Sequence, residues 1–193
     1  MASRGHLQTA DSSPRTGTVR QLKVTLRQVR PPVWRRLLID SSWTLAKLSG
    51  ALETAMGWYG GHLHAFDSDG VMYGQLDPDW DVRDVRKVRV GDLLAGVGSK
   101  MRWDYDFGDG WEHDVVVEAI VDRDPKLRYP HCVAGRRACP PDDCGGPYGY
   151  AEMLEALGDT GHPRHEETAE WMSPRFDPAY FNAREINLLL GQR

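Results

Sequence analysis

Three cysteines lie close together in the sequence, and cysteine thiolates are strong ligands for zinc. Cys132, Cys139 and Cys144 follow a C-x6-C-x4-C spacing within a stretch rich in proline and glycine. With His113 or His131 as fourth ligand they could form a Cys3His zinc site. The common C-x2-C pair is missing, so the alternative is that buried thiols act as small apolar side chains. Under either interpretation we expect the three cysteines to lie within a few ångströms of one another.

A second set of candidate ligands alternates along a predicted hairpin. Residues 103–107 and 111–115 flank a Gly-Asp-Gly turn, and pairing Phe107 with Trp111 places the aromatic side chains on one face. The other face then carries four carboxylates: Asp104, Asp106, Glu112 and Asp114. Because like charges on a sheet repel, a divalent cation such as Mg²⁺, a basic partner segment or nearby arginines must offset them. We favour the arginines, and the candidates are Arg83, Arg86 and Arg89.

Two histidines form a third candidate site. His62 and His64 share one face of a predicted strand, and an H-x-H pair can chelate a metal ion. Two histidines are only half of a metal site, so the alternative is a surface that binds a partner. The aromatic residues Trp58 and Tyr59 precede the pair and would extend that surface.

These candidates need a scaffold, and hydrophobic periodicity predicts an α+β fold with strands first and helices last. A mixed, mostly antiparallel sheet should carry one helix on its face, in an order compatible with a β-grasp-like core. A helical lobe should follow at the C-terminal end. The predicted strands cover 21–27, 33–39, 62–66, 71–73, 87–90, 101–107 and 111–121. The predicted helices cover 45–56, with its cap at 40–42, then 150–158, 166–172 and a last helix capped by Asn182 and Glu185. Residues 122–149 are expected to form a long irregular loop.

Composition and charge narrow the class of protein. The chain has 193 residues and a net charge of −4, with a balance of +7 over residues 1–36 that leaves −11 for the rest. We expect a disordered basic arm at 1–18 and a single domain at 19–193. No apolar run is long enough to span a membrane, and three cysteines without a signal segment indicate the cytoplasm. An acidic body argues against broad nucleic-acid binding, although the basic arm could contact nucleic acid.

Common catalytic motifs are missing from the chain. The sequence contains no G-x-x-x-x-G-K-[ST] phosphate loop, no G-x-G-x-x-G that opens a helix after a strand, and no G-x-S-x-G. The Gly-Asp-Gly at 108–110 lies between two strands, so no helix N-terminus faces it. The sequence therefore assigns no catalytic residue.

Five stretches resemble the plasmid pRiA4b ORF-3-like family: LKVTLRQVRPPVWRRLLI, GWYGGHLHAF, DYDFGDGWEHDVVVE, YPHCVAGRRACPPDDCGGPYGY and FDPAYFNAREIN. They occur in the family's order over about residues 19–190. The resemblance implies an α+β fold, an association with plasmids or transposable elements, and no established reaction. Some members carry a resolvase-like label. This chain lacks both the Tyr-x-Arg-x-Ser start of a serine recombinase and the C-terminal residue set of a tyrosine recombinase, so that label does not describe its chemistry.

Three hypotheses about function follow. The favoured one is a non-enzymatic binding or adaptor protein with a protein partner, associated with mobile elements and with a structural metal at the cysteine loop as an option. The second is a metal-dependent hydrolase or nuclease-like enzyme that uses the acidic hairpin or His62 and His64. The third is a DNA-binding accessory protein that uses the basic arm.

Overall fold

The computed structural model describes residues 18–75, 81–172 and 176–192, and it confirms an α+β fold with a mostly antiparallel sheet. The strands are β1 (Thr18–Leu26), β2 (Trp34–Asp40), β3 (His64–Ser68), β4 (Val71–Gly74), β5 (Arg83–Asp84), β6 (Lys100–Tyr105), β7 (Trp111–Asp122) and β8 (His131–Arg136). The helices are α1 (Leu45–Met56), α2 (Val90–Leu93), α3 (Gly146–Gly158), α4 (His165–Trp171) and α5 (Ala183–Leu190). None of these helices is long and apolar enough to cross a membrane. The predicted arm at 1–18 lies outside the described residues, except for Thr18 at the start of β1.

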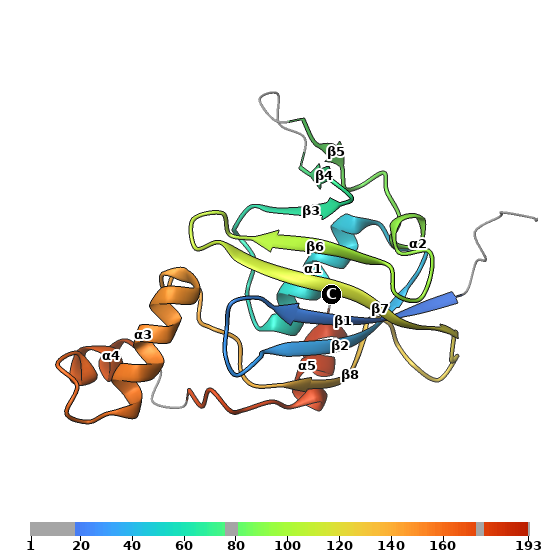
Figure 1. The fold of residues 1–193 in the computed structure, drawn as a ribbon. Helices are drawn as coiled ribbons and strands as arrows, with labels where there is room; N and C mark the ends of the chain where they lie inside the picture. Colours follow the sequence, from blue (N-terminus) through green and yellow to red (C-terminus); the bar gives the residue numbers. More distant parts are fainter. Residues whose placement is uncertain (1–17, 76–80, 173–175, 193) are drawn as a thin grey trace, which may run out of the picture.

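All described strands belong to one sheet, in the order β5-β4-β3-β6-β7-β1-β2-β8 (Figure 1). Every neighbouring pair is antiparallel except β4 and β5, which run parallel. The β1-β2-α1-β3 order on which the β-grasp-like expectation rested is present. The first strand, β1, lies inside the sheet between β7 and β2, so strands from both halves of the chain are neighbours there.

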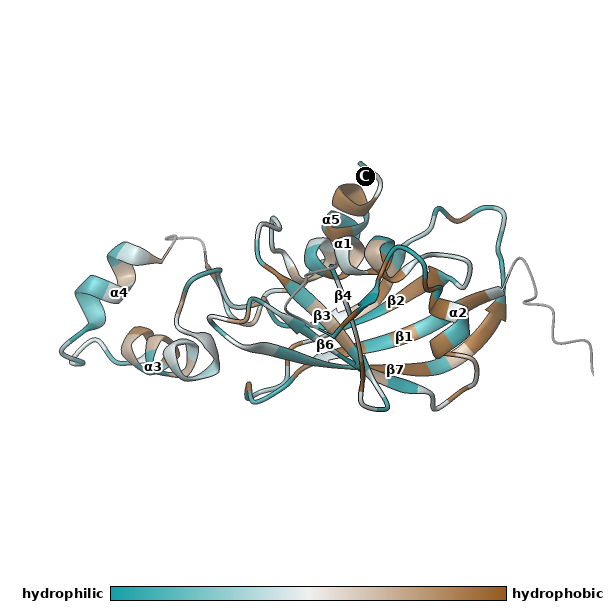
Figure 2. Cartoon of the chain, turned by 90° about the horizontal axis from the view of Figure 1, so that it is seen from above, coloured by the Kyte–Doolittle hydropathy of each residue, from teal (hydrophilic) through white to brown (hydrophobic). Residues whose placement is uncertain are grey.

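Helix α1 lies on one face of the sheet, and α5 lies beside it on the same face (Figure 2). The predicted apolar stripe of α1 is buried against the sheet, and its members are Leu45, Leu48, Leu52, Ala55 and Met56. The predicted cap at 40–42 is wrong, because the Asp40 carboxylate accepts hydrogen bonds from Ser42 and holds a turn there. The cap is Thr44, whose hydroxyl accepts the N–H of Lys47. Gly57 ends the helix with a φ of 96°, as the glycine predicts.

One strand was missed within the segment predicted to be irregular. β8 pairs with β2 at the edge of the sheet, and its short sequence contains a glycine, so it has little of the pattern of a strand. Two tertiary contacts hold it there. The Asn187 side chain on α5 bonds both the N–H and the carbonyl of Cys132, at 2.7 and 2.9 Å. The Phe181 ring occupies the space where a side chain at Gly135 would lie.

The hairpin register also differs from the prediction. Tyr105 pairs with Trp111 and Trp103 with His113, so Phe107 does not oppose Trp111. The strand ends early because Asp106 takes a left-handed conformation, with φ of 54°, and its carboxylate accepts the N–H groups of Gly108 and Asp109. A shift of two residues keeps every side chain of the paired strands on its predicted face. The aromatic side chains of β6 and β7 are therefore buried as expected, whereas Asp106 and Phe107 lie beyond the end of β6: Asp106 leaves the acidic face and Phe107 is 40% exposed.

His113 lies in the core and not beside the cysteines. Its ring is fully buried, and Nδ1 donates a hydrogen bond to the Trp103 carbonyl at 3.2 Å. The rings of Trp58 and Trp103 pack against it at 5.4 and 4.6 Å between centroids. Burial lowers the pKa of His113 to about 3, so the folded protein holds a neutral imidazole at neutral pH.

This burial predicts acid sensitivity. Below about pH 6.5, the unfolded chain protonates His113 while the folded chain does not, so stability should fall with pH down to about pH 3. The contribution is at most about 1.4 kcal/mol per pH unit. In urea unfolding at pH 7.5, 6.0 and 5.0, His113→Phe should show a shallower loss of unfolding free energy than the wild type. Val115→Ala, a buried apolar change on the same strand, should lower the free energy equally at each pH. An unchanged slope in His113→Phe would contradict the neutral core histidine.

Candidate functional site

The acidic outer face of the hairpin is neutralised by arginines, although not by the predicted ones. Arg27, the residue after β1, pairs with Glu112 at 2.9 Å and with Asp114 at 3.9 Å. Arg102 on β6 pairs with Asp104 at 2.9 Å and with Asp67 on β3 at 3.4 Å. The predicted Arg86 instead pairs with Asp84 on β5. These partners could not be predicted, because the hairpin sequence alone does not show that β3 lies beside β6 and β1 beside β7.

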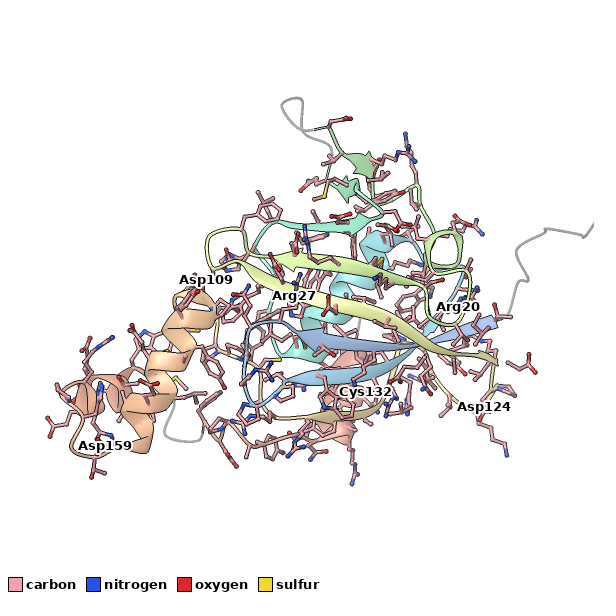
Figure 3. All side chains as sticks on the ribbon, in the orientation of Figure 1. Arg20, Arg27, Asp109, Asp124, Cys132 and Asp159 are labelled. Atoms are coloured by element: carbon pink, nitrogen blue, oxygen red, sulfur yellow. The ribbon has the colours of Figure 1, made fainter. Side chains whose placement is uncertain are left out.

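The expected gathering of the cysteines into one ligand set is not observed. Cys132 lies on β8 (Figure 3). Cys139 contacts Met56, with 3.4 Å between the two sulfurs. Cys144 lies close enough to Asp109, at the hairpin tip, for the carboxylate charge to add to burial in raising the pKa of its thiol. All three are buried free thiols, and no three Cys, His or acidic ligands that include them or His113 approach within 4.8 Å of one another in the described part of the chain. Burial raises the pKa of each thiol, that of Cys144 to about 12, which favours the neutral form.

A different set of ligands comes together at the end of the β6–β7 hairpin. His62, Asp106 and Asp143 each place one ligand atom within 4.8 Å of the other two. His62 Nδ1 lies 3.2 Å from the Asp106 carboxylate, and Nε2 lies 4.0 Å from that of Asp143. One imidazole between two carboxylates is a ligand set that suits a divalent metal ion. We call these three residues the His-Asp-Asp cluster.

The cluster adjoins polar atoms that are buried without a partner. Tyr105 is fully buried, and its hydroxyl has no hydrogen-bond partner among the described residues. Its ring meets the edge of His62 at 5.6 Å between centroids. Burial raises the pKa of Tyr105, and so do the nearby carboxylates, which belong to Asp142, Glu53, Asp106 and Asp143. One oxygen of Asp142 is likewise buried and unpaired. Such groups cost free energy in an apolar interior, and their position beside the His-Asp-Asp cluster makes this region a candidate functional site.

A second histidine lies against a carboxylate on the same side. His64 Nδ1 is 3.8 Å from Glu53 on α1, and Ser49 donates a hydrogen bond to the same oxygen at 3.0 Å. Burial lowers the pKa of His64, and the Glu53 charge opposes that shift. His64 Nε2 is buried and has no partner within the described residues. The predicted H-x-H pair is therefore divided, with His62 in the cluster and His64 beside Glu53.

Trp58 joins the segments that carry these groups. It was expected to be exposed for partner binding, but it is 3% exposed, because it stacks on Tyr105 at 4.6 Å with an interplanar angle of 9°. Its indole N–H donates to the Pro140 carbonyl at 3.0 Å and so holds the loop before Asp142 and Asp143. Tyr59, the other predicted aromatic, is 92% exposed.

The hairpin tip is attached to α3 through two close contacts. The Asp109 carboxylate accepts the N–H of Gly145, the residue that caps α3, at 3.2 Å. Gly146 has a φ of 68°, and a Cβ there would lie 2.2 Å from the Asp109 carbonyl oxygen. This close approach places Asp143 near Asp106, although the two are far apart in the sequence.

The sequence patterns single out His62, His64 and Asp106 as candidate ligands but do not group them. They do not indicate Asp142, Asp143, Tyr105 or Glu53. Except for Glu53, all of these residues fall in three of the stretches that carry the family resemblance, GWYGGHLHAF, DYDFGDGWEHDVVVE and YPHCVAGRRACPPDDCGGPYGY. These three stretches meet at the site in the fold, and the resemblance that they share is the signal that could have indicated it.

The close contact at Gly146 predicts a specific sensitivity. Gly146→Ala should lower the unfolding free energy by about 1–3 kcal/mol, because the new Cβ meets the Asp109 backbone and the backbone is left-handed. The control is Gly158→Ala at the end of α3, where a Cβ meets nothing within 4 Å. Chemical denaturation should show that control unchanged or slightly more stable. Equal stability of the two variants would contradict the attachment of α3 to the hairpin.

Comparison with known proteins agrees with this structure. The family model described as "Plasmid pRiA4b ORF-3-like protein" matches residues 18–185. "Uncharacterized protein y4hQ" of Sinorhizobium fredii (strain NBRC 101917 / NGR234) is 39% identical over 178 residues, which are 88% of this chain and 89% of that protein. The crystal structure of MM3350, a protein of unknown function from Methanosarcina mazei Go1, is 33% identical with a TM-score of 0.81 and covers 88% of this chain and 97% of its own. The chain therefore belongs to the plasmid pRiA4b ORF-3-like protein family.

Proposed function

We propose that this protein is a metal-dependent hydrolase-type enzyme whose ion is held by His62, Asp106 and Asp143. The observation that carries the proposal is the approach of three ligand atoms within 4.8 Å of one another. Three protein ligands leave coordination positions for water and substrate, which is the usual arrangement of a catalytic metal site. A metal ion in such a site lowers the pKa of bound water and polarises a carbonyl oxygen.

The groups around the cluster fit roles in hydrolysis. His64, paired with Glu53, is a neutral base of the kind that accepts a proton from water. The Tyr105 hydroxyl stays protonated, because burial and its acidic neighbours raise its pKa, and it has no partner among the described residues. It is therefore a free donor for an oxygen that gains negative charge during the reaction.

The charge of the surroundings favours some substrates over others. Besides the two ligand carboxylates, the carboxylates of Asp109 and Asp142 lie near the cluster and add negative charge to the site. An acidic surrounding repels a polyphosphate backbone, so nucleic acid is a poor substrate here. The negative charge around the cluster therefore favours an uncharged ester or amide as the substrate.

Metal titration tests the proposal. Isothermal calorimetry with Mn²⁺ or Zn²⁺ should show one strong site in the wild type. Asp143→Asn should weaken it at least about tenfold, because a charged ligand is replaced by a neutral one. The Asp143 side chain is 79% exposed, so this change should not disturb folding. The loaded enzyme should also hydrolyse 4-nitrophenyl acetate, with loss of turnover on chelation.

The matched control is Asp114→Asn on the outer face of the hairpin, where the side chain is 60% exposed. It should keep the affinity of the wild type. Equal binding by Asp143→Asn and Asp114→Asn, or no binding at all, would overturn the metal site. One bound metal without turnover of any ester or amide would overturn the hydrolytic role and leave a metal-binding protein.

An adaptor role is the second candidate, because two large apolar side chains are exposed next to the cluster. Tyr59 is 92% exposed and Leu63 is 59% exposed, and both flank His62 in the loop between α1 and β3. A protein partner that covers this loop would bury both side chains. Under this hypothesis, Tyr59→Ser should abolish a crosslinked complex without changing metal affinity. The DNA-binding alternative rests on residues 1–17, which lie outside the described residues.

A further inference from the structure

A cavity of about 570 Å³ lies between α1, the segment 138–142 and the C-terminal segment that leads into α5. The cavity is within the size range of sites that bind small molecules. One wall is apolar, and its main side chains are Ala55, Met56, Cys139, Phe181, Ile186 and Leu189. The cavity is therefore suited to the hydrocarbon part of a ligand.

A buried arginine supplies the polar end of the same cavity. Arg35 is 4% exposed, and its guanidinium carbon lies 5.1 Å from the centre of the Phe181 ring. Its donors reach only neutral acceptors: the carbonyls of Ala55, Trp34 and Arg136, and the Cys139 sulfur at 3.5 Å. No carboxylate forms an ion pair with Arg35 within the ranges that the structure describes. A buried guanidinium without a counter-ion is costly, and a ligand carboxylate would offset that cost.

The other charges on the wall disfavour a ligand with more than one negative charge. Glu185 also lines the cavity, but its carboxylate already accepts hydrogen bonds from Tyr180 and Asn182. Asp142 also lines the cavity, on the side that faces the His-Asp-Asp cluster. Two carboxylates on the wall would repel a dianion, whereas a single carboxylate can reach Arg35 and leave its apolar body against Met56 and Phe181.

We infer that this cavity binds a monocarboxylic acid with an apolar body, held by Arg35. The inference does not depend on the metal-dependent activity, because no residue of the His-Asp-Asp cluster is required. Octanoate is a simple probe of this class, and octan-1-ol is its uncharged counterpart of equal chain length.

Isothermal calorimetry with the full chain tests the inference. Octanoate should bind, and octan-1-ol should bind at least about tenfold more weakly. Leu189→Trp should abolish octanoate binding, because the larger side chain fills the cavity from a position that is 48% exposed. Leu188→Trp is the matched control: it lies one residue earlier on α5, is 62% exposed and does not line the cavity.

Arg35→Met tests the charge directly, with circular dichroism to confirm folding. It should abolish the preference for octanoate over octan-1-ol. Equal binding of acid and alcohol by the wild type, or wild-type binding by Leu189→Trp, would overturn the inference. If Arg35→Met does not fold, the comparison of acid with alcohol and the two tryptophan variants still decide it.

Discussion

The packing of Trp58 on Tyr105 is the interaction on which the rest of the site depends. The indole is buried between the sheet and the segment after β8, and its N–H bonds the Pro140 carbonyl. One side chain thus connects the end of α1, the end of β6 and the loop that carries Asp142 and Asp143. Large aromatic side chains dominate core energetics, and a buried indole N–H needs an acceptor, so the position of this loop is closely defined. The hairpin tip adds a second connection through Asp109 and α3.

This arrangement explains why polar groups collect at one end of an otherwise apolar core. The sheet and α1 bury aliphatic and aromatic side chains along most of their length, while His62, His64, Glu53, Tyr105 and Asp142 lie at the end where the loops meet. Unpaired polar atoms here reduce stability, and proteins retain such costs mainly at functional sites. The same loop also borders the cavity beside Arg35, so one segment separates a polar site from an apolar one.

Much of the fold could be predicted from local sequence signals. The apolar stripe of α1, the Asn182 cap of α5 and the two faces of the paired hairpin strands each depend on neighbouring residues, and the structure confirms them. The register of the hairpin could not be predicted, because it depends on hydrogen bonds that Asp106 makes in the turn. β8 could not be predicted either, because Asn187 and Phe181 hold it from a segment that is distant in the sequence. The site was only half predicted: a His-x-His pair is visible in a sequence, whereas Asp143 looks like any surface carboxylate until the fold brings it to His62.

The proposed metal site holds one divalent cation between His62, Asp106 and Asp143. The most direct test is anomalous diffraction from crystals of the full chain soaked in Mn²⁺. We expect a single strong peak in contact with all three side chains, at metal–ligand distances of about 2.0–2.3 Å. A crystal that diffracts well but shows its strongest peak at the cysteines or on the outer face of the hairpin, or no peak, would contradict it.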